Sequence, residues 1–109
     1  MRLSRNVFNA IIFAVMKKYE LMVIYEPALK EEGVKKEISL LKEKISSLKA
    51  SIVKEDYWGI KDLAYEMEKN TSGYYNLLHV ELNPDQINEI TLFLRRHKSG
   101  VLRFLLTEI

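Results

Sequence analysis

The sequence predicts an α+β domain whose elements follow the order β-α-β-β-α-β. Short runs rich in aromatic and β-branched residues alternate with two segments in which apolar residues recur at every third or fourth position. Gly, Pro and Asn stand between these runs, as they do where strands and helices end. With 109 residues, the chain has the length of one such domain.

The first predicted strand and the first predicted helix lie between residues 19 and 49. Residues 19–25 (YELMVIY) form an apolar and aromatic run that ends at Glu26-Pro27, which is typical of a buried strand. Residues 29–49 predict a helix, because their apolar positions step by four, three, four and three. The resulting stripe, with Lys and Glu on the opposite face, consists of Val34, Ile38, Leu41, Ile45 and Leu48.

Two longer strands are predicted between residues 50 and 82. Residues 50–58 are rich in β-forming residues and stop at Gly59. The alternation of Leu63, Tyr65 and Met67 then predicts that the strand resumes after a bend or bulge at that glycine. Residues 70–73 (Asn-Thr-Ser-Gly) predict a turn, and residues 74–82 predict the third strand.

The last helix and strand follow residue 82. Asn83-Pro84-Asp85 opens the helix, since Pro suits the first turn and Asp complements the helix dipole. Ile87, Ile90 and Leu94 are expected on its inner face. Residues 98–100 (Lys-Ser-Gly) are expected to stop it, with Gly100 in a left-handed cap, before a final strand at 101–108.

This order of elements is the split-βαβ, or ferredoxin-like, arrangement. It predicts a four-stranded antiparallel sheet with two helices on one face and the other face open. Because this fold supports many activities, function has to be argued from particular sites.

The N-terminal segment is expected to lie outside this domain. It carries basic residues and no acid around an apolar run at 7–16, which resembles the start of a secretory signal. The run is short, Asn9 interrupts it, and it falls well below the roughly 20 residues of a membrane span. We therefore expect residues 1–15 to be an extension, or to precede a true start at Met16, and residues 16–109 to form the domain.

Several classes of chemistry find no support in the sequence. The absence of cysteine excludes disulfides, cysteine-bound zinc, iron–sulfur clusters and thiol catalysis. Neither His79 nor His97 has a second ligand at helical spacing, and Glu66 and Glu68 are best explained as one solvated strand face. No phosphate-binding glycine motif is present. We expect no catalytic residue, no metal and no cofactor.

One candidate site is basic. Residues 95–109 hold four basic groups and one acid, the basic groups being Arg95, Arg96, Lys98 and Arg103. Helix-dipole complementarity explains some of this charge, but three cations within four residues exceed that role and suit phosphate binding. The net charge of +2 is too small for attraction through the whole molecule, so any such contacts must be local.

A second candidate site is apolar. If the longer apolar series of the third strand faces the helices, Tyr75 and Leu77 lie on the open face, where Trp58 and Tyr65 can join them. Such a face is a base-stacking platform or a protein-docking patch. Residues 72–76 (Ser-Gly-Tyr-Tyr-Asn) lack the basic residue and the later aromatic of an RNA-recognition motif, so protein docking is favoured.

Three blocks of the chain, in the correct order and spacing, resemble the bacterial small-subunit ribosomal protein S6 family. The central block, residues 55–82, matches the family signature at Gly59, Lys61, Leu63, Ala64, Tyr65, Lys69, Gly73 and Tyr74. The opening MKKYELMVIYEP (16–27) resembles the family's first strand, and VLRFLLTEI (101–109) its last. The resemblance spans residues 16–109.

The resemblance implies a non-catalytic component of the cytoplasmic ribosome. It would bind the central domain of the small-subunit ribosomal RNA together with ribosomal protein S18, without a membrane or a small-molecule substrate. Arg95 or Arg96, with Arg103, would match the family's basic residues near RNA phosphates, and Lys17 and Lys18 match its basic start, so these residues are candidates for RNA binding. Tyr65, Tyr75 and Leu77 are candidates for partner docking.

The chain departs from the family pattern at two positions of the signature. Asp62 stands where a second basic residue is usual, and Glu66 where Pro or a basic residue is common. The alternative is a ferredoxin-like homo-oligomeric ligand-binding or regulatory domain that uses the same open face.

Overall fold

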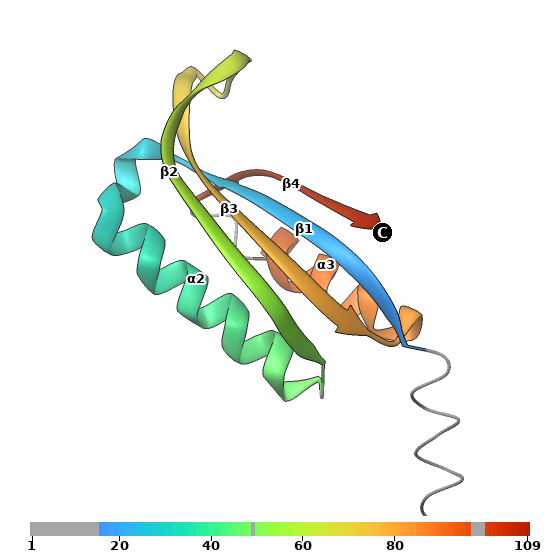
Figure 1. Ribbon diagram of the computed structural model, residues 1–109. Helices are drawn as coiled ribbons and strands as arrows, with labels where there is room; N and C mark the ends of the chain where they lie inside the picture. Colours follow the sequence, from blue (N-terminus) through green and yellow to red (C-terminus); the bar gives the residue numbers. More distant parts are fainter. Residues whose placement is uncertain (1–15, 49, 97–99) are drawn as a thin grey trace, which may run out of the picture.

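The computed structural model describes residues 16–48, 50–96 and 100–109, and there it shows one antiparallel sheet covered on one face by two helices (Figure 1). The strand order is β2-β3-β1-β4, which confirms the predicted ferredoxin-like arrangement. The elements are β1 (Lys17–Tyr25), a 3₁₀ turn (Pro27–Leu29), α2 (Lys30–Ser47), β2 (Ser51–Met67), β3 (Asn70–Leu82), a second 3₁₀ turn (Pro84–Gln86), α3 (Ile87–Arg96) and β4 (Val101–Glu108).

The core lies between the sheet and the two helices. All four buried positions of α2 belong to the predicted stripe, and α3 contributes Ile90 and Leu94. The sheet contributes alternate residues of β1 and β3, which are Tyr19, Leu21, Val23, Tyr25, Leu78, Val80 and Leu82. Because strand side chains alternate between faces, the residues between these positions lie on the side without helices.

The turn between β2 and β3 lies at Glu68 and Lys69, so the predicted turn at 70–73 is wrong. Both turn residues have positive φ angles, 45° and 66°, as a two-residue type I′ hairpin requires. Asn70 pairs with Met67, and Gly73 pairs with Lys61, so the predicted turn residues are part of β3. The prediction that Glu66 and Glu68 share a strand face is wrong for the same reason.

The irregularity at Gly59 is where the sequence predicts it. This glycine has a φ of 75°, and the pairing of β2 with β3 shifts between Tyr57 and Gly59. The strand continues through this bulge to Met67, which makes the β2–β3 hairpin much longer than β1.

The start of α3 is capped by side chains of the preceding turn. The Asn83 side chain accepts a hydrogen bond from the backbone N–H of Asp85 (3.0 Å), and Gln86 completes a capping box. The helix ends at Arg96, and residues 97–99, including Lys98 and His97, lie outside the described residues, as do residues 1–15. Gly100 has a φ of 120°, and its carbonyl accepts from the Glu26 N–H (2.7 Å).

In the part of the chain that the structure describes, no helix is long and apolar enough to cross a membrane.

Candidate nucleic-acid and partner interface

The face of the sheet without helices carries most of the candidate residues. Strand register places Gly59, Tyr75, Ile24 and Arg103 in one row across β2, β3, β1 and β4. The next row on the same face consists of Asp56, Leu77, Met22 and Leu105. The predicted apolar site and part of the predicted basic site therefore share one surface.

An aromatic pair lies at the β2 edge of this face. The Trp58 and Tyr75 rings stack with centroids 5.9 Å apart and an interplanar angle of 15°, and Trp58 is 42% exposed. The Lys61 ammonium lies 5.9 Å from the Trp58 ring centroid, within cation–π range. The pair is therefore preformed, and its partly exposed indole is available to an apolar partner.

Two apolar residues of this surface, Met22 and Leu105, could not be identified from the sequence pattern. Leu105 is 60% exposed, and Met22 joins Leu105 and Ile24 in lining a cavity of about 180 Å³. Residues 20–24 (ELMVI) and 103–107 (RFLLT) are largely continuous apolar runs with no polar alternation. Such a run does not say which of its side chains lie on which face until the strand register is known.

The β2–β3 hairpin extends beyond β1 and bends over the open face (Figure 1). Although β2 and β4 are the opposite edges of the sheet, the Arg103 Nη1 donates a hydrogen bond to the hydroxyl of Tyr65. Met67 lines a cavity together with Met22, Ile24 and Arg103. The hairpin tip thus meets β4, although β3 and β1 lie between β2 and β4 in the sheet.

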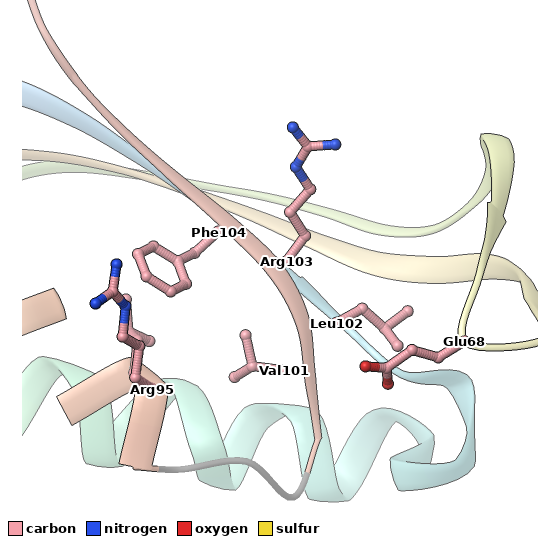
Figure 2. Close-up of a pocket in the computed structure, with 7 residues that line it drawn as sticks. Glu68, Arg95, Val101, Leu102, Arg103 and Phe104 are labelled. Carbon is pink, nitrogen blue, oxygen red and sulfur yellow. The ribbon is translucent and has the colours of Figure 1, made fainter. Parts of the chain in front are cut away.

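A basic cavity of about 530 Å³ lies where β4, the end of α3 and the hairpin tip meet. Figure 2 shows the Arg95 and Arg103 side chains pointing away from α2, with Phe104 beside Arg95. Glu68 contributes a carboxylate from the hairpin tip. Two arginines from different elements therefore line one hollow, and guanidinium groups are suited to binding phosphate.

The other predicted basic residues are not part of this cavity. Arg96 lines a separate hollow between the helices with Lys44, Glu89, Leu92 and Phe93. Lys17 pairs with Glu108 (3.4 Å) and Lys18 with Glu81 (3.9 Å), both near the start of β1. Since Arg103 pairs with Ile24, Lys17 lies seven residues away along β1, about 20 Å.

A polar cluster lies on the helix-facing side of the sheet, and the sequence did not predict it. Asn76 is 1% exposed, and its Nδ2 donates to Glu55 (3.3 Å), which also pairs with Lys42. Burial, followed by the nearby carboxylates of Glu37 and Glu55, raises the pKa of the Tyr25 hydroxyl above its ordinary range. These groups stand apart from the basic cavity.

Of the two histidines, His79 lies in the described part of the chain. His79 is partly exposed and its Nε2 lies 3.9 Å from the Glu20 carboxylate, across the open face between β3 and β1. Among the described residues no group of three or more His, Cys, Asp or Glu side chains could hold a metal ion.

Comparison with known proteins agrees with this geometry. The model of the family described as "Ribosomal protein S6" matches residues 18–108. Proteins named "Small ribosomal subunit protein bS6" are 32% identical over 90 residues in Phocaeicola vulgatus (83% of this chain, 78% of the relative) and 31% identical over 93 residues in Clostridium botulinum (85% and 99%).

A solved structure shares the fold. The crystal structure of 30S ribosomal protein S6 from Thermotoga maritima superposes with a TM-score of 0.82 at 24% identity, covering 86% of this chain and 88% of that one. The shared fold is the four-stranded antiparallel sheet with two helices.

Proposed function

The chain belongs to the ribosomal protein S6 family, and from this premise we propose that it is a non-catalytic component of the small ribosomal subunit that binds small-subunit ribosomal RNA together with ribosomal protein S18. The relatives are named as ribosomal proteins and not as enzymes. The proposed RNA target is the central domain of the small-subunit ribosomal RNA. The proposed domain is residues 16–109, with residues 1–15 as an extension, in line with the family match over 18–108.

The observation that carries RNA binding is the shared cavity of Arg95 and Arg103. Each guanidinium is attached to a different element, so a phosphate in the cavity would be held from two directions. Guanidinium groups donate two parallel hydrogen bonds to phosphate oxygens, which makes them better suited than lysine to this contact. With a net charge of +2, the chain must rely on such local contacts.

Lys98, Lys17, Lys18 and Arg96 are proposed as secondary RNA contacts. Lys98 follows α3 in sequence and is outside the described residues, and Lys17 and Lys18 are engaged in ion pairs with exposed carboxylates. Exposed pairs of this kind contribute little to stability, so both ammonium groups stay available for phosphate. A folded RNA that contacts them would have to extend from the cavity along the length of β1.

The partner surface is proposed to be the apolar part of the open face. It comprises the Trp58–Tyr75 stack, Leu77 and Tyr65, to which Met22 and Leu105 are added here. Large exposed apolar side chains gathered on one face are typical of a protein interface. Because this surface borders Arg103, one partner chain can rest on it while RNA contacts the adjacent cavity.

The test of assembly is co-sedimentation. Full-length tagged chain should travel with small ribosomal subunits in a sucrose gradient at low salt, and a fraction should stay with them at high salt because the partner interface is apolar. A discrete small oligomer that sediments apart from subunits at both salt concentrations would contradict the proposal and favour the homo-oligomeric alternative.

The test of the RNA contact is affinity against salt concentration. A transcript of the central domain should bind the chain weakly alone and more tightly with S18, because a few local phosphate contacts on a chain of net charge +2 leave binding weak at physiological salt. Substituting both Arg95 and Arg103 by Gln should reduce the magnitude of the salt slope by about 2. An unchanged slope would remove this cavity from the RNA interface.

A further inference from the structure

We infer that Tyr65 and Arg103 act together as one phosphate-binding pair, in which the tyrosine hydroxyl orients the guanidinium and supplies a second donor to the same phosphate. This inference rests on the proposed RNA-binding function and deepens it. Tyr65 is proposed above as a partner-docking residue, and here it takes a separate role at the RNA surface.

The Tyr65 hydroxyl lies at the opposite edge of the sheet from its own strand. Tyr65 belongs to β2 and Arg103 to β4, the two edges of the sheet, yet Arg103 Nη1 donates to the Tyr65 hydroxyl. The contact exists because the hairpin bends over the open face and brings its tip to β4. Tyr65 is 57% exposed, so its hydroxyl is not holding the core together.

Apolar packing holds the β2–β3 hairpin in this bent position. Gly73 has no side chain, and its Cα approaches the side chains of Ile24 and Leu63 closely enough that an added Cβ would meet both. Ile24 is only 8% exposed although it lies on the face without helices, which means that the bent hairpin covers it. Met67, near the hairpin tip, lines the same cavity as Ile24 and Arg103. The bend therefore depends on apolar packing, and the hydroxyl is free for another role.

The direction of the hydrogen bond leaves the Tyr65 hydroxyl able to donate. The phenolic oxygen accepts from the guanidinium, so the phenolic proton is left to point outward and donate. A hydroxyl that accepts from a cation becomes a stronger donor, because hydrogen bonds in a chain polarise one another. Arg103 has four further N–H groups, and its side chain is exposed. A phosphate at this rim would meet a phenolic O–H and a guanidinium held in one orientation.

The donors of this pair suit the phosphate backbone of RNA. Tyrosine hydroxyls and arginine forks both donate to phosphate oxygens and carry no base information. Arg103 lines the same cavity as Arg95, and Tyr65 is joined to Arg103 by their hydrogen bond, so the three side chains can contact one stretch of RNA backbone. The structure therefore assigns the pair to backbone positioning and not to base readout.

The experiment uses the full-length chain and a transcript of the central domain of small-subunit ribosomal RNA, with affinity measured across a range of salt concentrations. Tyr65→Phe should weaken binding about 3- to 10-fold at fixed salt, the effect of one lost hydrogen bond. The salt slope should stay unchanged, because no charge is removed. Arg103→Gln should weaken binding and also reduce the magnitude of the slope by about 1.

Two further variants separate a paired role from a purely structural one. Arg103→Lys keeps the charge but loses the planar fork, so it should weaken binding with an unchanged slope. In the Arg103→Gln background, Tyr65→Phe should have a smaller effect than in the wild type, because the two residues act as a unit. Tyr57→Phe removes a hydroxyl that has no hydrogen-bond partner among the described residues and that lies beside α2, away from Arg103, and it should bind RNA as the wild type does.

The outcomes distinguish the inference from the proposed function. If Arg103→Gln weakens binding while Tyr65→Phe binds as the wild type does, the pair is refuted and RNA binding at the cavity stands. Equal losses from Tyr65→Phe in both backgrounds would also refute the pair, because the tyrosine would then act independently. If the wild-type chain shows no affinity for the transcript with or without S18, the proposed function fails, and the inference fails with it.

Discussion

Gly73 on β3 lies directly against Ile24 on β1. A Cβ at Gly73 would stand 2.7 Å from Ile24 Cγ2 and 3.2 Å from the carbonyl oxygen of Tyr25, and 3.6 Å from Leu63 Cδ2. Real Cβ atoms do not approach other atoms as closely as the first of these distances. The missing side chain therefore fixes the point at which the β2–β3 hairpin bends over β1 and toward Arg103.

Gly73→Ala should lower the free energy of unfolding by about 1–3 kcal/mol, because overpacking forces Ile24 or the backbone of β1 to move. Urea denaturation measures this change. The displaced hairpin should also carry Tyr65 away from Arg103, so RNA affinity should fall in the same variant.

Gly59→Ala is the matched control for Gly73→Ala. Gly59 has a φ of 75° and no atom within 4 Å of an added Cβ, so the substitution introduces only backbone strain of about 1–2 kcal/mol. RNA affinity should stay at the wild-type level. Equal losses of RNA affinity in the two variants would show that Gly73 does not position the hairpin.

The element order and the core stripes were predictable because local periodicity encodes them. The four buried positions of α2 follow the helical spacing, and Asn83 and Gln86 form the expected kind of helix start. The turn at Glu68 and Lys69 was not predictable in this way, because the residues that usually adopt positive φ, Asn70 and Gly73, stand next to it.

The candidate site was only partly predictable, because it depends on contacts between elements distant in sequence. The sequence could not choose between Arg95 and Arg96, which are neighbours on one helix. The structure separates them, because Arg95 shares a cavity with Arg103 and Arg96 faces the groove between the helices. Nor could it reveal the contact of Tyr65 with Arg103, since both lie on strands at opposite edges of the sheet.

The two faces of β3 should respond differently to substitution. Tyr75→Glu should fold, with a loss of about 0.5–1.5 kcal/mol from the broken aromatic pair, and should abolish binding to S18. Leu78 is fully buried, so Leu78→Ala should lower the free energy of unfolding by about 2–5 kcal/mol. Denaturation and pull-down with S18 check both results, and S18 binding by Tyr75→Glu at the wild-type level would exclude Tyr75 from the interface.

Neighbouring arginines on α3 should differ in their effect on RNA binding. Arg95→Gln should reduce the magnitude of the salt slope by about 1, because it removes a phosphate contact at the cavity. Arg96→Gln removes the same charge from the adjacent position, where the side chain lies near Lys44 and Glu89, and as a secondary contact it should reduce the slope by less than Arg95→Gln does. If both variants reduce the slope equally, the RNA covers the end of α3 as a whole and the cavity has no special role.

Deletion of residues 1–15 should leave folding and subunit incorporation unchanged. The first strand begins at Lys17, and every residue of the described core lies after it. Thermal denaturation and sucrose-gradient sedimentation of the 16–109 chain test this expectation. A large loss of thermal stability would show that the apolar run at 7–16 packs into the domain.

Tyr25→Phe should change how stability depends on pH. Burial, helped by the carboxylates of Glu37 and Glu55, raises the pKa of the Tyr25 hydroxyl above its ordinary value of 10.0, so the folded state favours the neutral phenol. Below pH 10 the hydroxyl is neutral in both states and this contribution to stability is fully present. As pH rises from 10 toward the pKa of the folded state, the unfolded chain loses the proton first, and stability falls by about 1.4 kcal/mol per pH unit.

Removing the Tyr25 hydroxyl should therefore make the loss of stability above pH 10 less steep by that amount, while the Tyr57 hydroxyl, whose pKa is also raised by burial, still contributes. At pH 7 the variant should be as stable as the wild type, or more stable by up to about 1 kcal/mol. The hydroxyl is buried without a hydrogen-bond partner among the described residues, so its removal relieves a desolvation penalty. Urea denaturation at pH 7, 10 and 11 measures both effects, and parallel pH profiles for the two proteins would show that the hydroxyl ionises as readily in the folded chain as in the unfolded one.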